Sequence, residues 1–300
     1  MNSVFFLGKN FAPLRLCVRF LSREGAEAQS RQSSNSKLYI IPVLLIFLSF
    51  DKPAASHHTR AVLPKIDNIP FQPGEKLTFN LHYGIINAGT AYLEVNKKET
   101  EIAGQKHFEI DVNGNSNSFF DPFYKVRDNY KSFIDESTML PSLFIRDVHE
   151  GSYSKKENYI FVRRKNEVVS GKRIYSVPEG VHDLVSTFYY LRCIDFSKQK
   201  IGAVMHITAL FDDSLLNTGL VYSGKETIST KFGKIRCYVF HPILVKGRIF
   251  KNQEGMILYV SEDKNQIPVR IESKVYLDYV RADLEKYENL KYPLEALEKK

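Results

Sequence analysis

The residue types of a hydrolytic triad occur close together at His182, Asp183 and Ser186. A serine nucleophile needs a histidine base beside it and a carboxylate that orients the histidine. On a helix, positions 182 and 186 share a face, whereas position 183 is turned away by about 100°. The three side chains therefore do not line up, and we interpret Asp183 and Ser186 as the cap of a helix.

Other groups with catalytic or metal-binding chemistry are equally sparse. Asp212 and Asp213 could form a carboxylate pair, but adjacent acids in a turn are usually solvated. His57 and His58 lie in a proline-rich segment without further ligands at metal-binding spacing. The sequence contains no nucleophile elbow, zinc-protease helix, phosphate loop or dinucleotide fingerprint. We therefore assign no catalytic residue and expect neither a metal nor a cofactor.

Cys193 and Cys237 are the two cysteines that follow the N-terminal region. In an oxidising compartment they could form a disulfide bond. The alternative is two buried, reduced thiols, because two cysteines alone carry no spacing signature. Both alternatives stay open at this stage.

Alternation of apolar and polar residues is the main structural signal of the chain. In residues 76–83, Leu77, Phe79, Leu81 and Tyr83 point one way, as in a half-buried strand. The same pattern predicts further strands at residues 90–96, 107–112, 124–133, 143–148, 158–164, 167–174, 203–211, 220–227, 235–242, 256–261, 269–273 and 274–284. Many short strands at near-regular spacing indicate a mainly β fold, a large antiparallel barrel-like or curved sheet.

Residues 181–192 break this alternation. Val181, Leu184, Val185, Phe188 and Leu191 recur at helical spacing and form one apolar face. A single central helix in a β protein must bury that face, so we expect it to plug a barrel or to cross a sheet. Asp183 lies near its start, where a carboxylate accepts unpaired N–H groups.

The N-terminal region has the character of a targeting signal. Residues 38–50 are almost wholly apolar, follow Arg31 and Lys37, and precede the small residues 54–56. As a helix this stretch would span about 20 Å, less than the ~30 Å of a bilayer core. It fits the core of a signal peptide, with a buried strand or an uncleaved anchor helix as alternatives. We thus expect an exported, periplasmic protein without a stable transmembrane span in the mature chain.

These patterns divide the chain into four parts. Residues 1–55 form an N-terminal extension with the signal peptide, and the proline-rich residues 56–73 form a linker. Residues 74–285 form the antiparallel β domain, and residues 286–300 form a charged C-terminal tail that we expect to fray. The net charge of +8 is spread thinly and lacks clustered basic residues, so we expect no nucleic-acid partner.

Three strings taken together resemble the domain of unknown function 3108 family of exported bacterial proteins. The first leads from residues 71–77 to Tyr83–Gly84 and Ala88–Gly89, the second is residues 183–192, and the third joins residues 258–263 to 267–271. The sequence of the third string is most similar to members from the Bacteroidetes. The resemblance implies an exported protein with a barrel-like fold, and it implies no reaction.

The motif positions receive structural interpretations. We expect Gly84 and Gly89 in turns, Asp183 and Ser186 in a helix cap, and Arg192 in an ion pair. The complete set of motif positions that we interpret as structural is Gly74, Glu75, Gly84, Gly89, Asp183, Ser186, Tyr189, Arg192 and Pro268.

Three functional hypotheses follow. We favour a non-enzymatic cell-envelope protein that binds a lipidic or glycan ligand, or an envelope partner protein. The second hypothesis is a structural or interaction module without a small ligand. It treats the 17 tyrosines and 21 phenylalanines as core packing instead of the lining of a lumen. The third is a hydrolase of envelope polymers with carboxylates from distant strands.

Overall fold

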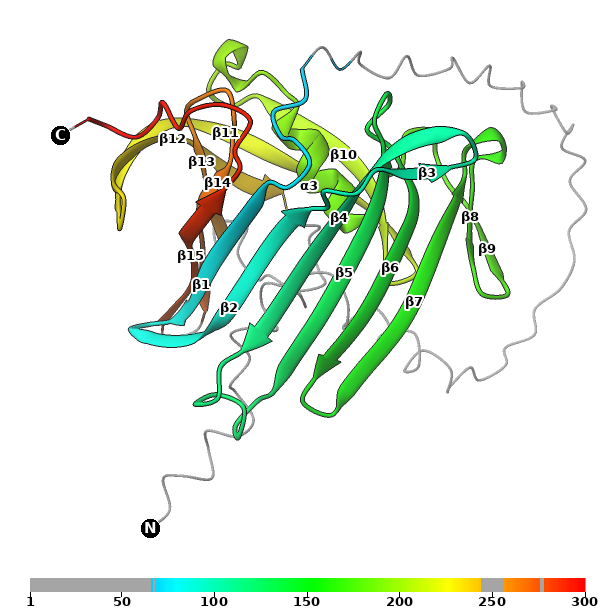
Figure 1. Cartoon of the computed structure of the whole chain (residues 1–300), viewed down its shortest axis with the longest axis horizontal. Coiled ribbons are helices and arrows are strands. Elements are labelled where there is room, and N and C mark those ends of the chain that lie inside the picture. Colours follow the sequence, from blue (N-terminus) through cyan, green and yellow to red (C-terminus); the bar gives the residue numbers. More distant parts are fainter. Residues whose placement is uncertain (1–65, 67, 244–255, 276–277, 300) are drawn as a thin grey trace, which may run out of the picture.

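The protein folds as one large, strongly curved antiparallel sheet (Figure 1). A computed structural model describes residues 66, 68–243, 256–275 and 278–299. The sheet has 15 strands, and its path runs in the order β10-β11-β12-β13-β14-β15-β1-β2-β4-β5-β6-β7-β8-β9, with β3 paired to β4. The path does not return from β9 to β10, so the sheet is open. This architecture confirms the predicted mainly β, barrel-like or curved fold.

The elements have these bounds: β1 Lys76–Tyr83, β2 Ile86–Val95, β3 Thr100–Ile102, β4 Gln105–Ser116, β5 Val126–Asp135, β6 Pro141–Glu150, β7 Tyr153–Val162, β8 Glu167–Ser170, β9 Arg173–Ser176, β10 Val204–Phe211, β11 Ser214–Thr230, β12 Gly233–Ile243, β13 Met256–Ser261, β14 Pro268–Val275 and β15 Asp278–Glu288. The α-helix α3 covers Leu184–Arg192, and short 3-10 helices η2 and η3 cover Arg163–Lys165 and Phe196–Lys198.

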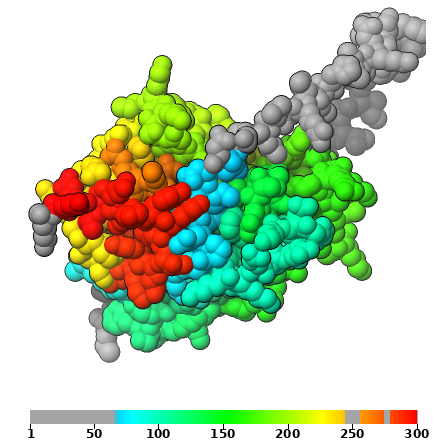
Figure 2. Space-filling view, turned by 45° about the horizontal axis from the view of Figure 1, so that its top comes forward, coloured from blue at the N-terminus to red at the C-terminus, as the bar shows by residue number. Residues whose placement is uncertain are grey.

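Pairing of β1 with β15 joins the two halves of the chain in the middle of the sheet. Their register runs from Lys76 opposite Glu288 to Tyr83 opposite Val280. Figure 2 shows the segment leading into β1 between the C-terminal segment and the following strands. Both segments are tied together, since Asn289 donates to the carbonyl of Pro73 at 3.0 Å and Lys291 to that of Ile69 at 2.7 Å.

Strand β5 illustrates how the sequence produces this sheet. Its residues alternate strictly between buried and half-buried from Val126 to Asp135. Apolar members of the buried set, Tyr130 and Ile134 among them, face the concave side of the sheet. Asp128 and Ser132 share that side although they are polar. Their presence inside becomes important for the charged groups described below.

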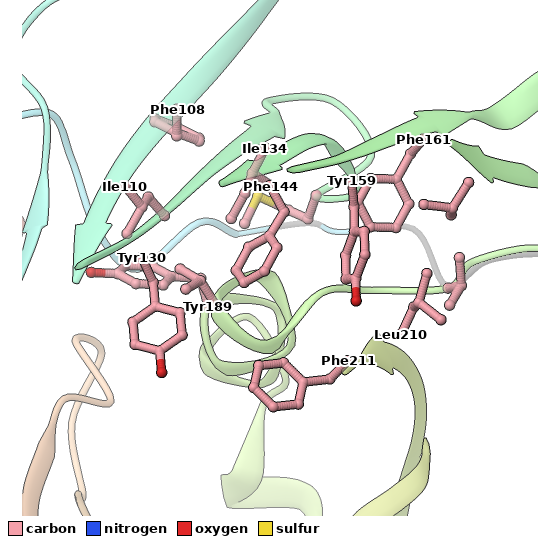
Figure 3. Packing of buried hydrophobic residues seen from close by; sticks show 14 of the residues in the cluster. Phe108, Ile110, Tyr130, Ile134, Phe144, Tyr159, Phe161, Tyr189, Leu210 and Phe211 are labelled. Carbon is pink, nitrogen blue, oxygen red and sulfur yellow. The ribbon is translucent and has the colours of Figure 1, made fainter. Parts of the chain in front are cut away.

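The helix α3 lies against the concave side and buries Val185, Ser186, Tyr189 and Arg192. The expected apolar face is only partly buried, because Leu184, Phe188 and Leu191 are half-buried and Val181 precedes the helix. Figure 3 shows Tyr130, Phe144, Tyr159 and Phe211 gathered around the helix. Phe144 and Tyr159 stack with ring centroids 5.8 Å apart, and Tyr189 of α3 contacts Phe71 at 4.8 Å. This part of the concave side is therefore filled by aromatic side chains, as the packing alternative predicts.

Several predicted boundaries need correction. Residues 167–174 were expected to form one strand, but they form the hairpin β8–β9, because Gly171 adopts a positive φ of 58° and reverses the chain. The last strand begins at Asp278 and not at residue 274, and β3 was missed.

The two segments that flank the sheet are also more ordered than expected. Phe71, in the expected linker, is 1% exposed. After β15, Ala296 is fully buried, and its N–H donates to Asp263 at 3.2 Å. The described part of the C-terminal tail thus makes contacts with the sheet through Ala296. The reason is that its few apolar residues, Ala296 and Leu297 among them, join a small core beside β12.

Candidate functional site

A buried ion pair joins the start of β1 to the end of α3. Arg192 donates from Nη1 to Glu75 Oε1 at 2.6 Å and from Nη2 to Glu75 Oε2 at 3.1 Å. Both side chains are almost completely inaccessible, at 3% and 0% exposure. Burial by itself lowers the pKa of Arg192, but the charge of Glu75 and its hydrogen bonds outweigh this and hold that pKa above its ordinary value.

The turn between β13 and β14 completes this arrangement. Arg192 Nη2 also donates to the carbonyl of Asn265 at 3.0 Å, and Gln266 Nε2 donates to the carbonyls of Arg192 and, at 2.8 Å, of Ile194. We call Glu75, Arg192, Asn265 and Gln266 the Arg192 clamp. It draws together residues from, or directly beside, all three strings that carry the family resemblance, although they lie far apart in sequence.

A pocket of about 670 Å³ opens beside the Arg192 clamp. Its walls come from the segment before β1, the end of α3, η3, β12, the β13–β14 turn and the C-terminal segment. These segments meet at the upper edge of the sheet in Figure 1. Side chains that matter for its chemistry are Tyr190, Ile194, Asp195, Lys198, Tyr238 and Lys264. We call this the α3 pocket.

The α3 pocket combines aromatic surface with donors and acceptors of both charge signs. Tyr238 packs edge-on against Phe196 at 5.9 Å, which fixes its ring. Asp195 accepts from the Ser197 hydroxyl at 2.5 Å and pairs with Lys198 at 3.0 Å, and these two groups hold its pKa below the ordinary value. Asp263 accepts from the N–H groups of Asn265 and Gln266 and so shapes the turn. These two carboxylates are thus occupied as acceptors, which suits binding better than proton transfer.

The two cysteines remain free thiols in the structure. Cys193 lines the α3 pocket and donates weakly to the carbonyl of Tyr189 at 3.4 Å, whereas Cys237 is buried in β12. Burial raises the pKa of each thiol to about 12, so both stay protonated and unreactive at neutral pH. The structure thus has two unpaired thiols, of which Cys237 is buried and Cys193 is half-buried.

At the other end of α3, His182, Asp183 and Ser186 do come together, but not as a triad. His182 Nδ1 lies 3.2 Å from Ser186 Oγ, whereas Asp183 accepts from Ser186 N at 2.7 Å and from Ser132 Oγ at 2.6 Å. Asp183 N–H in turn donates to Ser186 Oγ at 3.0 Å, which closes a capping box. All three residues are buried, and burial lowers the pKa of His182 to about 3. The carboxylate caps the helix and does not orient the imidazole.

A second group of charges lies under the β10–β11 turn. Arg146 donates to Glu157 at 2.8 Å and contacts Asp212 at 3.3 Å, while Lys155 binds the same two carboxylates at 3.0 and 2.5 Å. The Arg146 guanidinium also stacks 4.6 Å above Phe211. We call Arg146, Lys155, Glu157 and Asp212 the Arg146 cluster. Asp212 was expected to be solvated, yet its side chain is only 15% exposed.

Two further buried groups border the Arg146 cluster on the concave side. Asp128 accepts from His149 N–H at 3.1 Å, and burial together with the charge of Glu150 raises its pKa to about 7. Tyr130 lies beside the Arg146 guanidinium, and the guanidinium carbon is 5.9 Å from the centroid of the Tyr130 ring. We treat these two groups as structural, because both are buried among the strands of the sheet.

The remaining motif positions have local roles. Gly89 lies within β2 and not in a turn, so the expectation for this residue is wrong. A Cβ at Gly89 would lie 2.2 Å from the carbonyl oxygen of Asn115, so only glycine permits this approach of β2 to β4. Gly84, at φ 56°, turns the chain between β1 and β2. Gly74 donates to the carbonyl of Val95 at 2.7 Å, and Pro268 begins β14. Tyr189 is fully buried beneath the Arg192 guanidinium.

Sequence reasoning missed the α3 pocket and the Arg146 cluster. Tyr190 and Asp195 flank the predicted helix end, and their position next to Arg192 was the available signal. Arg146 carried no signal, since a charged residue in an alternating strand is normally placed on the solvent face. Within the described ranges, no helix has the length and apolar character needed to cross a bilayer, and no group of three or more potential metal ligands is present.

The fold and the pocket define a β-barrel-like protein with a helix packed inside an open, curved sheet. A solved structure of the same kind is the β-barrel-like protein of domain of unknown function DUF1849 from Brucella abortus. It has a TM-score of 0.51 and 12% identity, and the match covers 74% of this chain and 100% of that one. This likeness is one of fold.

The chain belongs to the family described as protein of unknown function DUF3108, whose pattern matches residues 78–285. A DUF1089 family protein from Pseudomonas aeruginosa is more distantly similar, with a TM-score of 0.33, 10% identity, and coverage of 60% of this chain and 87% of that one. No curated protein matches the sequence at a significant level. The predicted family is therefore confirmed, and its description assigns no activity.

Proposed function

We propose that the protein is an exported cell-envelope protein that binds a glycan in the α3 pocket. The observation that carries this proposal is the pocket itself, at the meeting point of the three motif strings. Its volume of about 670 Å³ lies within the ~300–1,000 Å³ typical of small-ligand sites.

The chemistry of the pocket favours a sugar over a lipid tail. Sugar hydroxyls both donate and accept hydrogen bonds, which suits a wall that mixes Asp195, Lys198, Lys264 and Gln266 with the aromatic residues Tyr190 and Tyr238. An acyl chain would remove water from these polar groups without offering them hydrogen bonds in return. The concave side next to α3 is packed with aromatic side chains.

Native mass spectrometry after gentle purification tests this proposal, followed by titration with neutral malto-, cello- and chito-oligosaccharides. We expect copurified sugar or saturable binding that Tyr190→Ala and Lys264→Ala weaken at least about tenfold. Lys172→Ala, an exposed lysine in the β8–β9 turn, is the matched control and should leave binding unchanged. An apo mass combined with no binding across glycan and lipid panels would contradict the proposal.

The export part of the proposal rests on residues 38–50, which lie outside the described residues. Their apolar composition, the preceding Arg31 and Lys37, and the small residues 54–56 support a cleaved signal peptide. The N-terminus of protein purified from the producing cells should begin near residues 54–57. An intact N-terminus on a membrane-bound chain would favour the anchor alternative.

The packing of the concave side supports a second candidate, a structural or interaction module without a small ligand. Phe144, Tyr159 and Phe211 pack in one buried core cluster with Val185 and Tyr189 of α3. In that case substitutions in the α3 pocket change no binding, while partner proteins are recovered by crosslinking in the envelope.

A further inference from the structure

Two loops at one end of the sheet present apolar side chains to solvent. Ile85 and Ile86 lie at the β1–β2 turn and are 100% and 42% exposed. Phe119 and Phe123 lie in the β4–β5 loop and are 65% and 67% exposed. We call these four residues the loop-tip patch. In Figure 1 both loops extend at the lower end of the strands, away from the segments that line the α3 pocket at the upper edge.

The two loops form one unit. Asn117 N–H donates to the carbonyl of Ala88 at 3.0 Å, and its side-chain amide donates to the carbonyl of Asn87 at 2.7 Å. Asn117 Oδ1 also accepts from Phe120 N–H at 3.0 Å. The tips of the two hairpins are thus held next to each other by direct hydrogen bonds.

The exposure of Phe119 and Phe123 is built into the loop. Phe120 between them is 3% exposed and packs into the core with Leu81 and Ala88. The ring centroids of Phe119 and Phe123 lie 6.3 Å apart, so the two exposed rings stand side by side. A loop anchored by one phenylalanine holds its two neighbours outward, where they cannot contribute to folding.

The charges next to the patch leave it with a positive balance. Asp121, the acid of this loop, is held by Arg127 through Nη1 at 3.1 Å and Nη2 at 2.6 Å, and by the Ser116 hydroxyl. These bonds hold the pKa of Asp121 below its ordinary value, so it stays paired. Lys125 is exposed on the same loop. A surface with apolar tips and an adjacent ammonium complements anionic phospholipid headgroups.

The size and shape of the patch decide between a membrane and a protein partner. Two phenylalanines about two-thirds exposed offer roughly 100–160 Å² each. With two isoleucines, the patch falls short of the ~800 Å² that one partner contributes to a stable protein interface. Its side chains also project from separate turns, and a fluid lipid surface accommodates such projections without a complementary socket.

We propose that the loop-tip patch inserts into the interfacial region of an anionic lipid membrane and orients the protein with its α3 pocket facing away from the bilayer. Phe119, Phe123 and Ile85 enter the boundary between headgroups and acyl chains, and Lys125 contacts the phosphates. This inference is independent of what the α3 pocket binds.

The absence of tryptophan from the chain makes a direct test available. Phe119→Trp introduces a single indole at the patch, and Ile174→Trp introduces one at a position on β9 that is equally exposed, at 65%. The naturally processed protein is mixed with vesicles of phosphatidylethanolamine and phosphatidylglycerol, with and without bromine on the acyl chains. We expect a blue-shifted emission and quenching by bromine at position 119 only.

Flotation with the same vesicles supplies the second measurement. The triple variant Ile85→Ser/Phe119→Ser/Phe123→Ser should lower the partition coefficient at least about tenfold, which corresponds to about 1.4 kcal/mol. The matched control Ile174→Ser/Ile201→Ser removes two exposed isoleucines elsewhere and should change it less than twofold. Lys125→Glu should weaken binding to anionic vesicles and leave binding to neutral phosphatidylcholine vesicles unchanged.

Three outcomes would overturn the proposal. Equal quenching at positions 119 and 174 would indicate nonspecific adsorption. A blue shift at position 119 that rises with protein concentration in the absence of lipid would indicate contact between copies of the chain. Binding of the triple variant equal to that of the parent protein would remove the patch from membrane contact. None of these results depends on sugar binding, so failure here is distinguishable from failure at the α3 pocket.

Discussion

Arg146 and Arg192 are both buried against aromatic rings, yet the structure neutralises them in different ways. Arg192 makes a two-bond ion pair with Glu75 and donates to a backbone carbonyl. Arg146 shares Glu157 and Asp212 with Lys155. Its Nε and Nη2 atoms have no hydrogen-bond partner among the described residues, whereas at Arg192 this holds for Nε alone. Arg192 thus has a single counter-charge, whereas Arg146 belongs to a group of two cations that share two carboxylates.

The difference matters because a buried charge is costly when its only counter-charge is removed. Arg192 is the one described cation that pairs with Glu75, whose side chain has no access to water. In the Arg146 cluster, Lys155 would continue to neutralise both carboxylates if Arg146 were replaced. The junction of β1, α3 and the β13–β14 turn therefore depends on the single ion pair of the Arg192 clamp.

The largest predicted effect is a contrast between two identical substitutions. Arg192→Met should lower the free energy of unfolding by about 3–5 kcal/mol, because it leaves Glu75 charged and buried without a cation. Arg146→Met should cost only about 1–2 kcal/mol, because Lys155 still pairs with Glu157 and Asp212. Urea unfolding followed by circular dichroism measures both values.

A double replacement controls for packing at the clamp. Glu75→Leu combined with Arg192→Met removes both charges and should recover part of the loss in stability. Equal losses in the free energy of unfolding for Arg146→Met and Arg192→Met would contradict the proposed difference between the two buried arginines.

The sequence predicts the scaffold of these two regions far better than their contacts. Alternation located most of the strands, and helical spacing located α3. The buried face of the helix differs from the expected one, since Leu184, Phe188 and Leu191 are only half-buried. The Glu75–Arg192 pair joins residues separated by 117 positions. Only the pairing of β1 with β15 and the packing of α3 bring them together, and no local pattern encodes that arrangement. The resemblance named both residues but did not pair them.

The Arg146 cluster escaped prediction for a different reason. Asp128, Arg146 and Glu150 occupy inward positions of β5 and β6, where alternation leads one to expect apolar side chains. The partners of Arg146 are Glu157, on another strand, and Asp212, in a turn that the sequence did identify. A period-two pattern specifies which residues share a face, but it does not say which polar residues are buried there.

A second prediction concerns the pH dependence of this polar interior. The pKa of Asp128 is about 7 in the folded protein, far above the ordinary value of 3.8. The folded state therefore holds a proton that the unfolded state releases, and stability contributed by this group falls as pH rises from about 4 to 7. Asp128→Asn keeps the acceptor for His149 N–H and removes this loss. The free energy of unfolding of Asp128→Asn, minus that of the parent protein, should therefore increase by on the order of 2 kcal/mol from pH 5 to pH 8.

Chemical unfolding at pH 5, 6, 7 and 8 measures this difference. Asp147→Asn is the matched control on the same pair of strands, since the Lys156 ammonium holds the pKa of Asp147 below its ordinary value. The difference in free energy of unfolding between Asp147→Asn and the parent protein should not rise with pH. Parallel curves for the parent protein and Asp128→Asn would show that Asp128 is ionised and well paired in the fold.

The third prediction compares the two ends of α3. Asp183→Ala removes the cap and leaves Ser132 without its acceptor, and it should cost about 1–2 kcal/mol. This is less than the loss expected at the Arg192 end, because no charge is left unpaired. Asp195→Ala removes the same type of cap from the exposed helix η3 and should cost a few tenths of a kcal/mol. A larger loss at Asp195 than at Asp183 would contradict the view that burial sets the cost.

The smallest predicted effect tests the turn that covers the Arg146 cluster. Asp212 and Asp213 both adopt positive φ values, 50° and 61°, in the two-residue β10–β11 turn. Asp213 accepts hydrogen bonds from Arg173 at 2.7 Å and Tyr175 at 2.6 Å, but these contacts are exposed and contribute little. Asp213→Gly loses them and gains a relaxed backbone, so the stability should change by less than about 0.5 kcal/mol.

Asp213→Ala loses the same contacts and keeps the left-handed conformation, so it should be less stable than Asp213→Gly by about 1 kcal/mol. Both variants retain the hydrogen bond from Asp213 N–H to the Tyr159 hydroxyl, which isolates the side-chain and backbone contributions. If glycine instead proves worse than alanine, the exposed contacts to Arg173 and Tyr175 hold the turn in place. The Arg146 cluster would then depend on the exposed Arg173–Asp213 ion pair, as the Arg192 clamp depends on Glu75.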